Sequence, residues 1–299
     1  MNQKEKREIL PIRFGADVGV LTVRRWMVER PRGRVICAHG IGSTGAEFAL
    51  LAVRLNALGF EVIVPDWIGH GDSQYLWQAE HYGWESYVRC LTAVARKYQN
   101  DRTHYVGISW GGMILLFFLN YMRTPPRSAV FIDVPFRRKP TLSDSSSGLR
   151  VQSAAAFDTV EEIEEFLYSR RPELRDTPAE WRDYFRKARF DLRDGKFVMR
   201  FDPAAIEALN KYADLPFNNY RGVARINCDA LFLYGKRSPY RDPVQFAQLR
   251  ARHPNIEYAI ALDAAHPPVL YTDEQLSPIT DFIDRKAVEP APINPEAGS

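Results

Sequence analysis

The sequence alternates short apolar runs with stretches of helical length, and this alternation constrains the fold more than any other feature. The runs are rich in β-branched and aromatic residues and are bounded by turn residues, which is typical of buried strands. We expect strands at residues 20–28, 34–39, 61–65, 104–108, 129–133, 230–234 and 256–262. Between most of them we expect helices at residues 46–58, 84–98, 110–122, 243–252 and 273–285. Such alternation predicts an α/β fold with a mostly parallel sheet and helices on both faces.

The alternation stops between residues 135 and 221, which open with a polar loop at residues 141–148 and continue with amphipathic helices. An insertion of this length between two strands favours a helical lid over a site. One of its helices groups Trp181, Tyr184 and Phe185 on one face. We expect these rings to lie over a substrate pocket or at the seam between lid and core; the alternative is that they form only the lid's own small core.

These boundaries divide the chain into three parts. Residues 1–134 and 222–288 are predicted to form the core, residues 135–221 a helical cap, and residues 289–299 a flexible tail rich in Pro and Ala.

Composition excludes several classes of protein. The 40 basic and 37 acidic side chains leave a net charge of +3 without a long basic block, so we expect no nucleic-acid partner. The three widely spaced cysteines fit neither a disulfide framework nor a metal site and suit a reducing compartment. No targeting segment is visible, and the longest apolar run is far shorter than the about 20 residues that span a bilayer. We expect a cytoplasmic protein without membrane insertion, and a homo-oligomer is possible.

Two glycine-rich motifs follow predicted strands. The sequence Gly-Ile-Ser-Trp-Gly-Gly at residues 107–112 lies where a strand ends and a helix begins, so the Ser109 hydroxyl should project above the sheet edge as a nucleophile. The sequence His-Gly-Ile-Gly-Ser at residues 39–43 can direct the amide of Ile41 at the same point as the amide of Trp110. Two such donors predict an oxyanion hole. His39 itself is expected to orient this loop.

Two further motifs complete the pattern. The Gly-His-Gly turn within residues 66–73 is interpreted as structural, because its glycines suit tight turns. His266 lies on a loop after the last predicted strand, where a histidine is well placed to act as a base for Ser109.

Together these motifs resemble the α/β-hydrolase family, in particular its lidded branch of esterases and monoacylglycerol-lipase-like enzymes. The resemblance runs from about residue 21 to residue 285 and implies an eight-stranded sheet, Ser109 as nucleophile, His266 as base and residues 135–221 as a cap. The chain departs from the family at the acid, where Ser238 occupies the usual position. Asp133, at the end of a strand, is the favoured substitute. Asp242 is the alternative, although it could equally cap the helix that follows.

The resemblance implies a serine hydrolase that cleaves a carboxylic ester, thioester or lactone of a small acyl substrate through an acyl-enzyme, with no metal or organic cofactor. A cofactor-free dioxygenase or a carbon–carbon bond hydrolase on the same fold is the first alternative. A non-catalytic receptor is the second, and the intact Ser109 and His266 argue against it. Haloalkane dehalogenases and epoxide hydrolases would carry an aspartate in place of Ser109.

Overall fold

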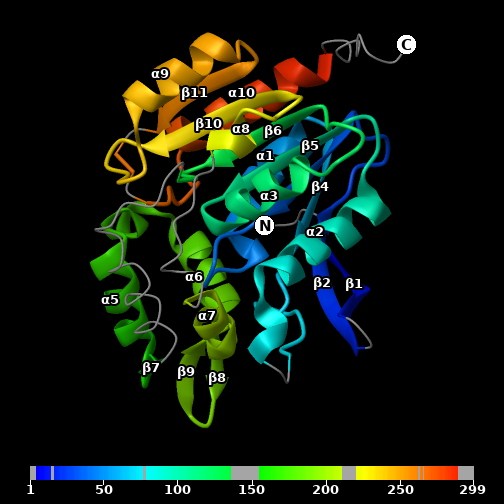
Figure 1. The fold of residues 1–299 in the computed structure, drawn as a ribbon. Helices are drawn as coiled ribbons and strands as arrows, with labels where there is room; N and C mark the ends of the chain where they lie inside the picture. The colour runs from blue at the N-terminus through cyan, green and yellow to red at the C-terminus, as the bar shows by residue number, and fades with distance from the viewer. Residues whose placement is uncertain are drawn as a thin grey trace.

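The computed structural model describes residues 5–14, 17–76, 79–135, 155–210, 220–261, 263–264 and 266–288. Eight strands form one sheet in the order β1-β2-β4-β3-β5-β6-β10-β11 (Figure 1). They are β1 (Glu5–Phe14), β2 (Asp17–Trp26), β3 (Gly33–Ala38), β4 (Phe60–Pro65), β5 (Thr103–Ile108), β6 (Ser128–Ile132), β10 (Asp229–Gly235) and β11 (Ile256–Ala261). β2 runs antiparallel to β1 and β4, and the six strands from β4 to β11 are parallel. The predicted eight-stranded, mostly parallel sheet is confirmed.

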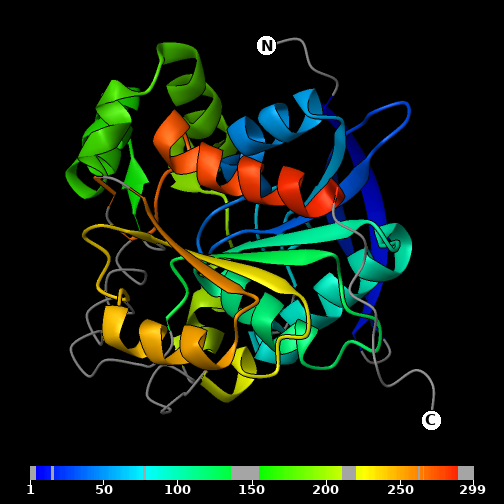
Figure 2. The same cartoon turned by 90° about the horizontal axis from the view of Figure 1, so that it is seen from above.

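Helices cover both faces of this sheet, as predicted (Figure 2). One face carries the 3₁₀-helix η1 (Gly45–Phe48) with α1 (Ala49–Ala57) and α10 (Asp273–Val288). The other face carries η2 (Ala79–Tyr82), α2 (Trp84–Tyr98), α3 (Trp110–Leu119), α8 (Tyr220–Val223) and α9 (Pro243–Arg252). Successive side chains of β5 enter different cores, with Tyr105 on one side and Val106 on the other. Burial on both faces explains why the inner strands are continuous apolar runs.

The edge strand β1 was not predicted. Over most of its length, side chains that are buried or partly buried alternate with exposed ones, because only one face of the strand packs against the core. The exposed positions tolerate charged residues. Next to it, the fully buried guanidinium of Arg24 contacts Glu5 Oε1 at 2.8 Å, Asp72 Oδ2 at 2.9 Å and Asp66 Oδ2 at 3.3 Å. This ion network fixes the antiparallel edge of the sheet to the turn that follows β4.

Residues 155–210, here called the insertion, contain a small sheet that was not predicted. Its helices are α5 (Val160–Arg170), η4 (Pro172–Asp176), α6 (Ala179–Arg189) and α7 (Pro203–Asn210). Its strands β7 (Ala156–Phe157), β9 (Lys196–Met199) and β8 (Phe190–Arg193) pair in that order. The hairpin turn places Asp194 and Gly195 at φ values of 50° and 77°, the left-handed pair that Asp-Gly favours. The predicted loop at residues 141–148 and the tail at residues 289–299 lie outside the described residues.

The insertion is fastened to the glycine turn that follows β4. The amide of Gly71 donates to the Arg200 carbonyl at 2.7 Å, and the amide of Asp202 donates to the Gly69 carbonyl at 2.8 Å. The Tyr82 hydroxyl donates to Asp202 Oδ2 at 2.7 Å. The elements of the insertion therefore gather at one end of the molecule (Figure 1). Within the described residues, the helices are too short or too polar to cross a bilayer.

Candidate active site

Ser109 lies in the turn between β5 and α3, in the left-handed region at φ 49° and ψ −116°. Its amide donates to the Ile132 carbonyl at 2.8 Å, which holds this turn against β6. A Cβ on Gly111 would lie 2.1 Å from the Ala38 carbonyl oxygen, and a Cβ on Gly107 would lie 2.6 Å from the Cα of Gly112. The two glycines therefore allow the start of α3 to lie close to the ends of β3 and β5. The strained turn presents the Ser109 hydroxyl at the sheet edge.

The structure brings His266 and Asp133 into line with Ser109. Ser109 Oγ lies 3.0 Å from His266 Nε2, and His266 Nδ1 lies 3.4 Å from Asp133 Oδ2. Asp133 directly follows β6 at φ 52°, and its amide donates to the Leu233 carbonyl at 2.8 Å. Its side chain is fully buried, whereas that of His266 is 23% exposed. This arrangement would allow the imidazole to accept the Ser109 proton while the carboxylate orients the ring.

The Asp133 contact is longer than an ideal hydrogen bond. Among the described residues, neither carboxylate oxygen of Asp133 makes a hydrogen bond, so either oxygen can accept one from His266 Nδ1–H. Contacts of this kind commonly tighten once substrate is bound.

The alternative acid has a different contact. Asp242 caps α9, where its Oδ1 accepts the Gln245 amide at 3.0 Å. Ser238, at the family's usual acid position, is buried and accepts the Tyr240 amide at 3.2 Å through its hydroxyl. The ring of Tyr240 meets the imidazole of His266 edge-on, with centroids 4.5 Å apart. Of the two candidate acids, the structure therefore places Asp133 beside the histidine.

The loop after β3 holds its amides in fixed positions. The Gly40 amide donates to Glu47 Oε1 at 2.8 Å, and the Gly42 amide donates to His70 Nε2 at 3.3 Å. The amide of Ile41, between them, has no such acceptor among the described residues. It is therefore available to a ligand. Sequence reasoning missed Glu47, although a lone carboxylate in the apolar run at residues 45–53 was a signal that could have identified it.

Two buried histidines stabilise this loop as neutral side chains. His39 donates from Nδ1 to the Gly40 carbonyl at 2.8 Å and accepts the Trp67 amide through Nε2 at 2.9 Å. Burial, with a smaller contribution from His70, holds the pKa of His39 well below its usual range. Burial likewise lowers the pKa of His70 to about 4. Both rings keep one acceptor nitrogen at neutral pH, as their bonds to the loop require.

Trp110 opens α3, so its amide is one of the helix N-terminal donors that lack an intrahelical partner. The Trp110 ring packs edge-on against Trp84, with centroids 4.7 Å apart. This contact helps to fix the start of the helix beside Ser109.

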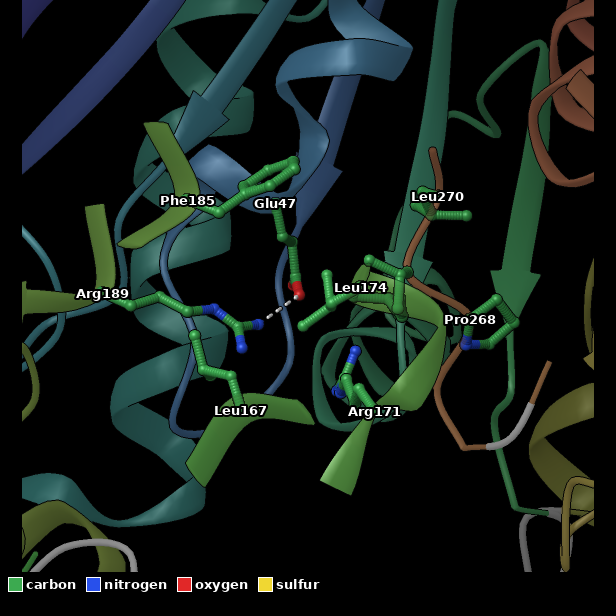
Figure 3. Close-up of a pocket in the computed structure, with 10 residues that line it drawn as sticks. Glu47, Leu167, Arg171, Leu174, Phe185, Arg189, Pro268 and Leu270 are labelled. Carbon is green, nitrogen blue, oxygen red and sulfur yellow. Dashed lines mark ion pairs between the residues drawn. The ribbon is translucent and has the colours of Figure 1, made fainter. Parts of the chain in front are cut away.

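The three predicted aromatic residues of α6 lie where the insertion meets the core. Phe185 is buried and lines a cavity between the insertion and the core (Figure 3). Trp181 and Tyr184 pack against the core on the α1 face, and the Tyr184 hydroxyl donates to Glu5 Oε2 at 3.1 Å. The cavity walls also include residues that sequence reasoning missed, namely Arg171 and Arg189, because both resemble the ordinary exposed charges of helix ends.

Comparisons with known proteins agree with this fold. A curated 3-hydroxybutyrate-oligomer hydrolase from Cupriavidus necator is 27% identical over 150 residues, which make up 50% of each chain, so this chain spans about half the length of that relative. An alpha/beta hydrolase structure from Novosphingobium aromaticivorans has a TM-score of 0.79 at 20% identity, covering 95% of this chain and 100% of that one. An esterase structure from Exiguobacterium antarcticum has a TM-score of 0.68 at 15% identity, covering 94% and 99%. The model of the alpha/beta hydrolase family matches residues 35–278, and the chain therefore belongs to the alpha/beta hydrolase family.

Proposed function

We propose that the protein is a serine hydrolase that cleaves a carboxylic ester, thioester or lactone through an acyl-enzyme. The observation that carries this proposal is the 3.0 Å contact between Ser109 Oγ and His266 Nε2 at the strained turn after β5. A hydroxyl held against an imidazole nitrogen is activated for attack as the ring takes its proton.

In the first half of the proposed reaction, Ser109 Oγ forms a bond to the substrate carbonyl carbon while its proton passes to His266 Nε2. Asp133 accepts a hydrogen bond from His266 Nδ1–H and stabilises the imidazolium by its negative charge. The amides of Ile41 and Trp110 donate to the oxyanion, and losing one such donor typically costs about 3–4 kcal/mol of transition-state stabilisation. The bond to the leaving alcohol or thiol then breaks, and the leaving group takes the proton from His266.

In the second half, a water molecule replaces the leaving group. His266 removes a proton from this water as the water oxygen attacks the acyl carbon, and the same amides receive the oxyanion. The acyl bond to Ser109 Oγ breaks, the proton returns to the serine, and the carboxylic acid leaves. Every proton and electron pair in these steps is supplied by the substrate, water and this chain's own side chains.

We propose that residues 135–221 act as a cap over this site. The support is that Leu167, Leu174 and Phe185 of the insertion line the same cavity as Ile108, which directly precedes Ser109. Esters of short hydroxy acids are the first substrates to test, because the curated relative is named for oligomers of 3-hydroxybutyrate.

Pre-steady-state kinetics with p-nitrophenyl butyrate test the proposal. When deacylation limits turnover, an acyl-enzyme predicts a burst of p-nitrophenol close to one equivalent per protein, lost in Ser109→Ala. The dioxygenase alternative would use the His266–Asp133 pair and would not require the serine as nucleophile. An oxygen electrode with a heteroaromatic substrate separates the two: oxygen uptake that persists in Ser109→Ala, without a burst in the unmodified protein, would contradict the hydrolase proposal.

A further inference from the structure

The cavity beneath the insertion brings three charged side chains into apolar surroundings. Arg171 follows α5, Arg189 ends α6 and Glu47 lies in η1, and Figure 3 shows their charged ends directed toward one another. The remaining described walls are mainly apolar, formed by Ile108, Leu167, Leu174, Phe185, Val269 and Leu270. An apolar cavity with a few converging polar groups is the usual form of a small-molecule site.

The charges in this cavity do not balance. Arg189, 16% exposed, lies 3.8 Å from the Glu47 carboxylate and donates to Ser43 Oγ at 3.0 Å. Arg171 makes no ion pair within 4 Å among the described residues, and its Nη1 donates only to the Pro267 carbonyl at 3.3 Å. Of the described residues that line the cavity, two therefore carry a guanidinium group and one carries a carboxylate, so the lining has one positive charge in excess.

The surroundings make this excess costly. Burial is the main cause that lowers the pKa of Arg171 to about 10, and the positive charge of Arg189 is the second cause. The carboxylates of Glu173 and Asp133 act on Arg171 only from beyond ion-pair distance. Burial also raises the pKa of Glu47, which weakens the single carboxylate that faces the arginines. An anionic ligand would offset the cost of burying the two guanidinium groups.

Each arginine also contacts a different side of the candidate active site. Arg171 is bonded to Pro267, the residue after His266, and Arg189 is bonded to Ser43 in the loop that presents the Ile41 amide. An anion held between the two guanidinium groups would therefore lie near the point at which Ser109 attacks.

We propose that Arg171 and Arg189 bind a free carboxylate of the substrate, so that the protein prefers acyl esters with a carboxylate a few bonds from the scissile ester. The proposal rests on the hydrolase function proposed above. A carboxylate fits because its two oxygens match the planar fork of a guanidinium, and the apolar walls can hold the methylene groups that join it to the ester.

The test compares monoethyl esters of succinate, glutarate and adipate with the corresponding ethyl methyl diesters, by measuring ethanol release. For the best chain length, kcat/KM should be about tenfold or more higher for the monoester, as expected for a charge-assisted contact. Arg171→Met should reduce this preference, taken as the ratio of kcat/KM for monoester to diester, to about twofold or less. The matched control is Arg170→Met, which removes the same charge from an exposed neighbour and should preserve the preference.

Several outcomes would overturn the carboxylate site. Equal kcat/KM for monoester and diester in the unmodified protein would contradict it. An equal loss of kcat/KM for both esters in Arg171→Met would also contradict it, because the guanidinium would then only hold the insertion in place. Stronger inhibition by inorganic phosphate than by glutarate would contradict the choice of a carboxylate.

If Arg171→Met fails to fold, Arg171→Lys keeps the charge without the fork and should retain only part of the preference. Failure of the proposed function is a separate outcome: the unmodified protein would then release ethanol from neither ester and give no burst with p-nitrophenyl butyrate.

Discussion

Replacing Asp133 with asparagine should lower kcat by about 10⁴-fold while leaving the fold intact. The Asp133 carboxylate is fully buried and lies 3.4 Å from His266 Nδ1, so its charge is well placed to stabilise the imidazolium. Asparagine has nearly the same shape but no charge, and its amide can donate to Nδ1. The imidazole would then carry its proton on Nε2, where it could not accept the Ser109 proton. A factor of 10⁴ corresponds to about 5.4 kcal/mol in activation free energy.

Steady-state hydrolysis of p-nitrophenyl butyrate at pH 7–8 measures this effect, and thermal unfolding verifies that the variant is folded. The matched control is Asp242→Asn, which should keep kcat within about threefold, because the Asp242 carboxylate caps α9 at the Gln245 amide and asparagine is an equally good cap. The reverse ranking, or an Asp133→Asn enzyme within tenfold of full activity, would refute Asp133 as the acid.

Four substitutions test stability. Arg24→Met should lower the free energy of unfolding by about 3–5 kcal/mol in urea titrations, because it removes the guanidinium that pairs with the fully buried Asp66 carboxylate. Arg285→Met, which removes an exposed ion pair, should lower it by less than about 1 kcal/mol. Gly111→Ala should lower the melting temperature, opposite to the gain usual inside helices, because its Cβ would lie 2.1 Å from the Ala38 carbonyl oxygen. Burial lowers the pKa of His104 to about 3, so the unfolded chain alone takes up this proton as pH falls below about 6.5. Stability should fall by up to about 1.4 kcal/mol per pH unit from this group, and His104→Gln should show a shallower decline in melting temperature between pH 6.5 and 5.

The elements that carry Ser109 could be predicted because their signal is local. A run buried on both faces, a glycine-flanked serine and an apolar helix follow one another without interruption at residues 103–119. The position of His266 was predicted from its place after the last strand. Neither inference needed a contact between distant residues.

The acid could not be assigned from sequence, because the choice depends on how separate strands align. Asp133 reaches His266 since β6 lies between β5 and β10, with Ile132 beside both Ile108 and Leu233. No local pattern encodes that register, so sequence reasoning could favour Asp133 but kept Asp242 as the alternative acid.

The cavity arginines were missed for a similar reason. Arg170 and Arg171 are adjacent at the end of one helix, yet Arg170 is exposed and stacks on Phe166 while Arg171 lines the cavity. The difference arises from the backbone at Arg171, which leaves the helix at φ −140°. The edge strand β1 was missed because its exposed face carries charged residues. In the sequence, such a charged segment resembles a polar chain end without regular structure.

Covalent labelling with a fluorophosphonate, followed by intact mass measurement and peptide mapping, tests most directly whether Ser109 is the nucleophile. We expect one adduct per chain, on the peptide that contains Ser109, and no adduct in Ser109→Ala. Labelling should also be strongly slowed in a His266→Ala variant, because the serine would lose its base. Folded protein that remains unlabelled, or an adduct that persists in Ser109→Ala, would contradict Ser109 as the nucleophile.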